Sequence, residues 1–121
     1  MTRFTLDSNQ LAQIRKAQQR IFIRKCIANI NHKFSDGFAK ACIRKDEEEE
    51  TVASALKDAK SYGITFENDL LFYTECIILL GINFDKKYQH PDWPSKILND
   101  QSLSGESKMN QIHEHLIFSI R

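Results

Sequence analysis

Residues 62–81 read YGITFENDLLFYTECIILLG, and this stretch decides the fold of the 121-residue chain. We expect Gly63 and Gly81 to end two helices, because glycine readily adopts the left-handed conformation that follows a helix C-terminus. Thr65 is expected to cap the helix between them, which carries almost no polar face. A helix that is apolar nearly all round belongs inside a domain, so residues 66–80 should form the centre of a helical bundle.

Helical periodicity continues on both sides of this segment. A first helix should begin near Asp7 or Ser8, and a second long one near Asp46, where residues 47–50 are all glutamate and suit a helix N-terminus. The apolar stripe of the first helix comprises Leu11, Ile14, Phe22, Cys26, Ile30 and Phe34. Shorter helices are expected after residues 35–36, after Asp92 and after Ser104. The sequence therefore predicts an all-α single domain, residues 1–121, with five to six helices.

Composition places the chain among folded proteins without a membrane span. Apolar residues make up 41% of it and eight are phenylalanine, which is enough for a core. No apolar run approaches the roughly 18 residues that a span requires, and the N-terminus lacks a signal-peptide core. Three cysteines, Cys26, Cys42 and Cys76, lie in apolar helical contexts, which favours buried reduced thiols. We therefore expect a cytoplasmic protein.

No pattern of residues indicates catalysis or a bound cofactor. His113 and His115 would point about 160° apart on a helix, and no Cys-x-x-Cys or His-x-x-x-His spacing occurs. The four glycines are distributed one per connection, so no phosphate-binding loop is present. The cysteines are expected to face the core and not to act as nucleophiles. We therefore expect a protein that is not an enzyme and has no metal or cofactor.

Charge is distributed unevenly although the net charge is only +1. Residues 1–45 contain ten Lys/Arg and two Asp/Glu, whereas residues 46–121 contain seven Lys/Arg and fourteen Asp/Glu. The two parts could pack together and complement each other. Alternatively, the aligned Lys16, Arg20 and Arg24 could form a basic face that binds the phosphates of nucleic acid, as in a regulator. Head-to-tail self-association, giving a homo-oligomer, also stays open.

A protein partner is favoured over nucleic acid. Helical geometry places Phe72 and Leu79 on the same narrow stripe as Asn68 and Glu75, which would make an apolar spot with a polar rim. Tyr88 and Trp93 add aromatic side chains in an irregular segment. The predicted partner-binding residues are Asn68, Phe72, Glu75, Leu79, Tyr88 and Trp93. The alternative is that Phe72 and Trp93 belong to the core.

Short motifs along most of the chain resemble a known family. They are Tyr62-Gly63-Ile64, the apolar helix ending at Leu80-Gly81, Phe84-Asp85, Trp93, Ile97-Leu98 and Asp100, preceded by Leu11, Ala17, Gln18, Phe22 and Phe34. They are similar to small helical proteins that bacteria encode beside type VI secretion genes, near spike, PAAR-type and effector proteins. The chain departs from that family at residues 82–83, Ile-Asn instead of Pro-Asp, and in the four-glutamate run.

The resemblance implies a role beside a secreted toxin or its delivery spike. The first hypothesis is a chaperone or adaptor for a type VI secretion effector. The second is an immunity protein that neutralises a cognate toxin. Both predict a protein partner, either a secreted effector or a component of the spike, and the resemblance does not distinguish them.

Overall fold

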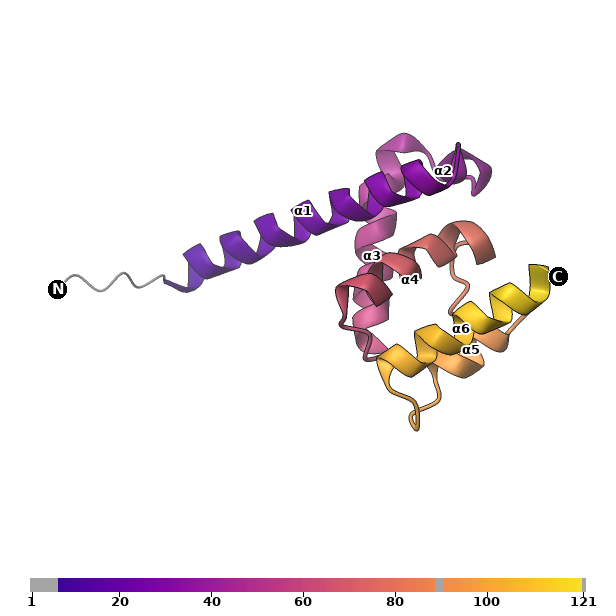
Figure 1. The fold of residues 1–121 in the computed structure, drawn as a ribbon. Coiled ribbons are helices and arrows are strands. Elements are labelled where there is room, and N and C mark those ends of the chain that lie inside the picture. Colours follow the sequence, from indigo (N-terminus) through magenta and orange to yellow (C-terminus); the bar gives the residue numbers. More distant parts are fainter. Residues whose placement is uncertain (1–6, 89–90, 121) are drawn as a thin grey trace.

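Six α-helices and one 3-10 turn make up the computed structural model, which describes residues 7–88 and 91–120. In chain order these are α1 (Ser8–Lys33), α2 (Gly37–Lys40), the turn η1 (Lys45–Glu47), α3 (Glu48–Ser61), α4 (Glu67–Leu80), α5 (Trp93–Leu98) and α6 (Gly105–Ile120) (Figure 1). No strand occurs in this part of the chain. The protein is thus an all-α single domain, as its periodicity predicts.

Helix α4 lies at the centre of the packing. It contacts α1, α2, α3 and α6, and its residues Tyr73, Cys76 and Ile77 are buried. Around it, α1 contributes Cys26 and Ile30 to the core, while later helices contribute Leu98, Met109 and Ile112. Burial of each such aliphatic side chain stabilises the fold by roughly 1.5–3 kcal/mol. The apolar segment between the two glycines is therefore the central helix that the sequence predicts.

Several helix ends follow the predicted chemistry. The Asp7 carboxylate accepts a hydrogen bond from the backbone N–H of Gln10, whose side chain accepts one from Asp7 in return. This reciprocal capping box starts α1. Gly63 has φ +83° and turns the chain so that the Ile64 N–H donates to the Ala59 carbonyl. The buried Ile64 side chain then seals the end of α3.

The predicted cap at Thr65 is wrong. Helix α4 begins at Glu67, and the residue at its N-cap is Phe66, in an extended conformation that supplies no side-chain hydrogen bond. The threonine stands one position too early for its hydroxyl to serve as the cap. Acidic residues in the first turn, Glu67 and Asp69, still favour this end through the helix dipole.

The prediction that all three cysteines are buried is wrong for Cys42. Helix α2 ends at Lys40, and Cys42 follows it in the left-handed conformation with φ +62°. This conformation lets the Ile43 N–H donate to the Phe38 carbonyl and buries the Ile43 side chain. Cys42 thus occupies a position that usually holds glycine, and its side chain points into solvent.

The N-terminal half of α1 extends away from the other helices (Figure 1). Every residue from 8 to 20 is exposed, and we call this segment the arm. Leu11 and Ile14, which belong to the predicted apolar stripe, are 41% and 42% exposed. The first fully buried side chain of α1 is Cys26. The apolar stripe of α1 therefore continues past the end of the helices that it packs against.

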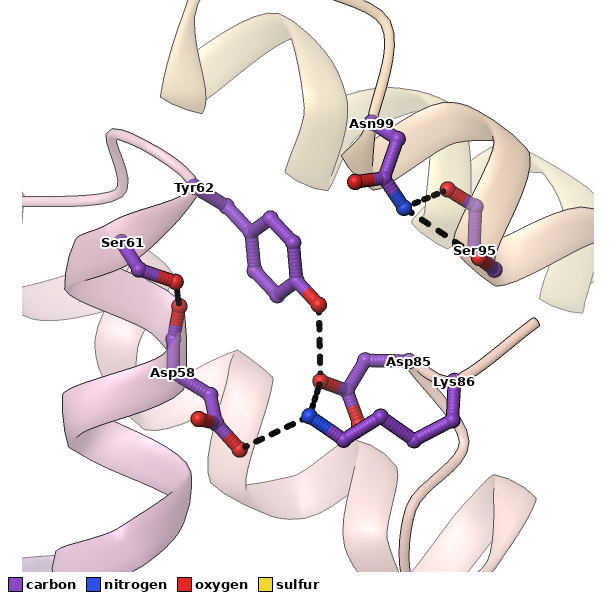
Figure 2. Close-up of polar contacts among 7 residues, drawn as sticks. All are labelled: Asp58, Ser61, Tyr62, Asp85, Lys86, Ser95 and Asn99. Atoms are coloured by element: carbon purple, nitrogen blue, oxygen red, sulfur yellow. Dashed lines mark hydrogen bonds and ion pairs between the residues drawn. The ribbon is translucent and has the colours of Figure 1, made fainter.

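Where α6 begins, backbone and polar groups from three segments of the chain are in close contact. A Cβ added to Gly105 would lie 2.2 Å from the Gly63 carbonyl oxygen, so α6 starts directly against the turn after α3. The Lys108 Nζ donates to the Tyr62 carbonyl at 2.8 Å. The Tyr62 hydroxyl donates to Asp85 at 2.8 Å (Figure 2). We call these five residues the base. Three of them, Tyr62, Gly63 and Asp85, belong to the motifs behind the family resemblance.

None of the helices in the described ranges is both long enough and apolar enough to cross a membrane.

Candidate partner-binding surfaces

Glu75, one of the predicted partner-binding residues, lies inside the domain. Its side chain is 6% exposed and forms an ion pair with the Lys33 Nζ at 2.6 Å. It also accepts a hydrogen bond from Asn29 at 3.1 Å. A buried carboxylate needs such partners, because an unpaired charge in the interior is costly. Glu75 therefore ties α4 to α1 and presents no free carboxylate to a partner.

The remaining five predicted residues are divided between covered and open positions. Phe72 is half-buried, with its ring edge-to-face against His113 of α6 and 5.4 Å between centroids. Trp93 is also half-buried and stacks on His115, with 4.5 Å between centroids. The other three, Asn68, Leu79 and Tyr88, are exposed. Two of the three predicted aromatic residues, Phe72 and Trp93, thus pack against α6, in the manner of the core alternative.

The predicted basic face is divided as well. Lys16 and Arg20 stand on the exposed arm. Arg24 lies 3.8 Å from Glu49, and two further cations of α1, Lys25 and Lys33, pair with acidic residues of α4. Near the domain, the basic helix and the acidic half of the chain therefore complement each other. On the arm, the positive charge is left facing solvent.

A groove lies beside the root of the arm, where α1 crosses α3 and the start of α4. Its volume is about 660 Å³ and it is open to solvent. Apolar side chains from all three helices line it: Phe22, Ile23, Ala53, Leu56 and Leu70. We call it the arm groove. Phe66, between the lining residues Thr65 and Glu67, is 61% exposed beside it.

The α1 side of the arm groove continues onto the arm. At 100° per residue, Leu11, Arg15, Gln18 and Phe22 fall within a sector of about 60° on α1. The last three line the groove, and Leu11 extends the same row by one more turn. Lys16 and Arg20 lie more than about 90° from this sector. The predicted basic face therefore points away from the groove.

The charged groups lining the arm groove are mainly positive. They are Arg15, Lys57, Lys60 and Glu67. Glu67 is already paired with Lys25. Among the described residues, none of the three cations forms an ion pair. The groove therefore combines an apolar floor with uncompensated positive charge.

A second, smaller hollow of about 320 Å³ lies between α3, α4 and the following loop. Its carboxylates are Glu47, Glu50, Asp58 and Asp85. Lys86 bridges the last two at 3.8 and 3.2 Å, and the hydrogen bond to Asp85 raises the pKa of the Lys86 amine (Figure 2). The charges of this hollow are thus partly satisfied from within the chain.

The described residues include cysteine thiols and a buried tyrosine hydroxyl that could in principle take part in catalysis. Burial raises the pKa of the Cys26 and Cys76 thiols, which disfavours the nucleophilic thiolate. Burial also raises the pKa of Tyr73, whose hydroxyl has no hydrogen-bond partner in the described part of the chain. No group of three or more His, Cys, Asp or Glu in these ranges could hold a metal ion. The features of the surface that could recognise another molecule are the shape, the apolar lining and the charges of the arm groove and the smaller hollow.

Sequence reasoning missed the arm groove because it placed Leu11 and Ile14 on one apolar stripe with residues that are buried, Cys26 and Ile30 among them. Helix length carries the signal that could have found it. Helix α1 has 26 residues, whereas α3 and α4 have 14 each. At 1.5 Å per residue, α1 is about 18 Å longer than either helix against which it packs. One end of α1 must then extend beyond its neighbours, together with whatever apolar residues it carries.

Comparison of the chain with models of protein families, with curated proteins and with solved structures gives no match.

Proposed function

We propose that this protein is a non-enzymatic protein-binding module whose partner lies along the arm and the arm groove. The observation that carries this proposal is the exposure of Leu11 on the row of α1 that leads into the arm groove at Phe22. Exposed apolar side chains that lead into an apolar groove form a surface that a partner can cover. Covering it would remove apolar area from water without disturbing the packed helices.

We further propose that the partner is a type VI secretion effector and that the protein acts as its chaperone or adaptor in the bacterial cytoplasm. The support for this assignment is the resemblance of the motifs at residues 62–64, 84–85 and 93–100 to proteins encoded beside such effectors. An immunity protein, which would hold a toxin through the same surface, is the second candidate. The two roles make opposite predictions for the partner in living cells.

The binding surface is tested with two matched double variants, each adding two negative charges to the arm. Leu11→Glu/Ile14→Glu places the charges at the exposed apolar residues, and Ala12→Glu/Gln13→Glu places them on the opposite side of the same helix. Each variant is co-expressed with the effectors and spike proteins encoded next to the gene, and complexes are isolated by affinity purification. The first variant should lose the partner and the second should keep it, with equal helical circular dichroism.

Deletion of the gene then separates the two candidate roles. If the neighbouring effector disappears or is no longer exported, the chaperone or adaptor role is supported. If the cells die only when they carry the toxin, the immunity role replaces it. Failure of every neighbouring product to co-purify, together with tight salt-dependent binding to random DNA, would overturn the protein-binding proposal in favour of a nucleic-acid-binding regulator.

A further inference from the structure

We propose that the arm groove binds an acidic amphipathic α-helix of the partner. This inference rests on the proposed function and specifies what kind of segment the surface accepts. It combines the apolar floor formed by Phe22, Leu56 and Leu70 with the uncompensated charges of Arg15, Lys57 and Lys60.

The floor fits one apolar face of a helix. From Leu11 to Phe22 the exposed row of α1 spans about 17 Å, which matches three turns of a partner helix. Leu56 of α3 and Leu70 of α4 close the groove at its root, so the seated end of the partner would contact three helices. Anchors at positions i, i+3 or i+4, and i+7 are the usual way in which a helix occupies such a groove.

The cations of the arm groove determine which charges the partner helix should carry beside its apolar face. Lys57 and Lys60 are one turn apart on α3, and Arg15 faces the groove from α1. Since Glu67 is held by Lys25, a bound segment meets cations on both sides of the apolar floor. Carboxylates flanking the apolar positions of the partner would pair with them. Such complementarity speeds association and rejects segments of the wrong charge.

A second copy of the same chain fits the groove less well. Two arms packed face to face would bring both copies of Arg15 together, and each arm carries three basic residues and no acidic one. Like charges brought together in this way oppose association. The charge of the groove therefore selects an acidic segment from another protein.

The inference is tested with two fluorescein-labelled peptides of roughly 15 residues, long enough to hold a helix in water. Both carry the same leucine stripe on an alanine background, but one has glutamate and the other lysine at the flanking positions. Fluorescence anisotropy is recorded against the full chain at low and physiological salt. The acidic peptide should bind at least about tenfold more tightly than the basic one, a difference of about 1.4 kcal/mol.

Charge reversal in the groove supplies the matched controls. Lys57→Glu/Lys60→Glu should abolish or invert the preference for the acidic peptide. Lys16→Glu/Arg20→Glu makes the same change of net charge on the opposite side of α1 and should preserve the preference. Circular dichroism checks that both variants keep the helical content of the parent chain.

Several results would overturn the inference. Equal binding of the two peptides, no binding of either, or indifference to Lys57→Glu/Lys60→Glu would each do so. A dimer seen by sedimentation and dissolved by that variant would assign the groove to a second copy. If Leu11→Glu/Ile14→Glu releases the natural partner but Lys57→Glu/Lys60→Glu does not, the proposed function stands and the acidic-helix inference fails.

Discussion

The arm and the base are opposites in how they relate to the rest of the molecule. Each of the thirteen residues of the arm is exposed, and α1 reaches a buried side chain only at Cys26. In the base, Gly105 lies against the backbone of Gly63, and the Lys108 amine donates a hydrogen bond to the Tyr62 carbonyl at the end of α3. The base is therefore held by packing and hydrogen bonds, whereas the arm leaves apolar surface free. Substitutions in the two regions should separate folding from binding.

The largest predicted contrast is between two leucines. Leu98 is fully buried and Leu11 is 41% exposed. Leu98→Ala should lower the free energy of unfolding by about 3 kcal/mol, because it leaves a cavity in the core. Leu11→Ala should change it by no more than about 0.5 kcal/mol. Urea denaturation followed by circular dichroism measures both, and similar losses in the two variants would show that the arm packs against the domain.

Gly105→Ala tests the close approach in the base. The added methyl would lie 2.2 Å from a backbone oxygen, which cannot move aside as a flexible side chain can. We expect a loss of about 2 kcal/mol, in the range for overpacked sites. If the close contact were absent, alanine would instead stabilise the helix by up to about 1 kcal/mol. The sign of the change in the free energy of unfolding therefore shows whether the contact exists. Asn110→Ala, at an exposed position of α6, is the control and should be nearly neutral.

Two tyrosine-to-phenylalanine substitutions compare a hydroxyl that donates a hydrogen bond with one that has no hydrogen-bond partner in the described ranges. Tyr62 donates to Asp85 at 2.8 Å, whereas the Tyr73 hydroxyl has no partner among the described residues. Tyr62→Phe should cost about 1 kcal/mol of stability, and Tyr73→Phe should cost nothing or raise stability. Thermal unfolding of both variants measures the difference. A larger loss from Tyr73→Phe than from Tyr62→Phe would reverse the assigned roles.

The smallest predicted effect concerns pH. Burial, with a smaller contribution from Glu106, raises the pKa of the Asp69 carboxyl above its ordinary value of 3.8. The folded state thus holds this proton more tightly than the unfolded state, so the group lowers stability as pH rises from its ordinary pKa through its raised value. Asp69→Asn should therefore stabilise the protein slightly at pH 7, by less than about 0.5 kcal/mol, and not at pH 3. Denaturation curves at the two pH values test the sign, and Glu114→Gln, exposed on α6, serves as the control.

The helices were predictable because their signals are local. Gly63 and Gly81 end helices with positive φ, and Asp7 caps α1, as neighbouring residues alone suggest. The apolar composition of residues 66–80 likewise requires burial wherever the rest of the chain lies. The failures at Thr65 and Cys42 are also local, because each depends on a one-residue choice of backbone conformation that the side chain does not dictate.

The candidate surface was less predictable because it depends on distant partners. The burial of Glu75 requires Lys33 and Asn29 to meet it across two helices. The exposure of Leu11 requires that no other helix reach as far as the arm. Periodicity states which face of a helix is apolar, but the lengths and crossing positions of its neighbours decide where that face is covered.

The arm also bears on how this protein can change over generations. Its thirteen residues carry the tip about 20 Å from the point where α1 enters the domain. Because folding draws little on these side chains, natural selection for stability leaves them almost unconstrained. A lineage could therefore acquire a new binding target by exchanging a few positions within three and a half helical turns, while the scaffold behind them stays intact.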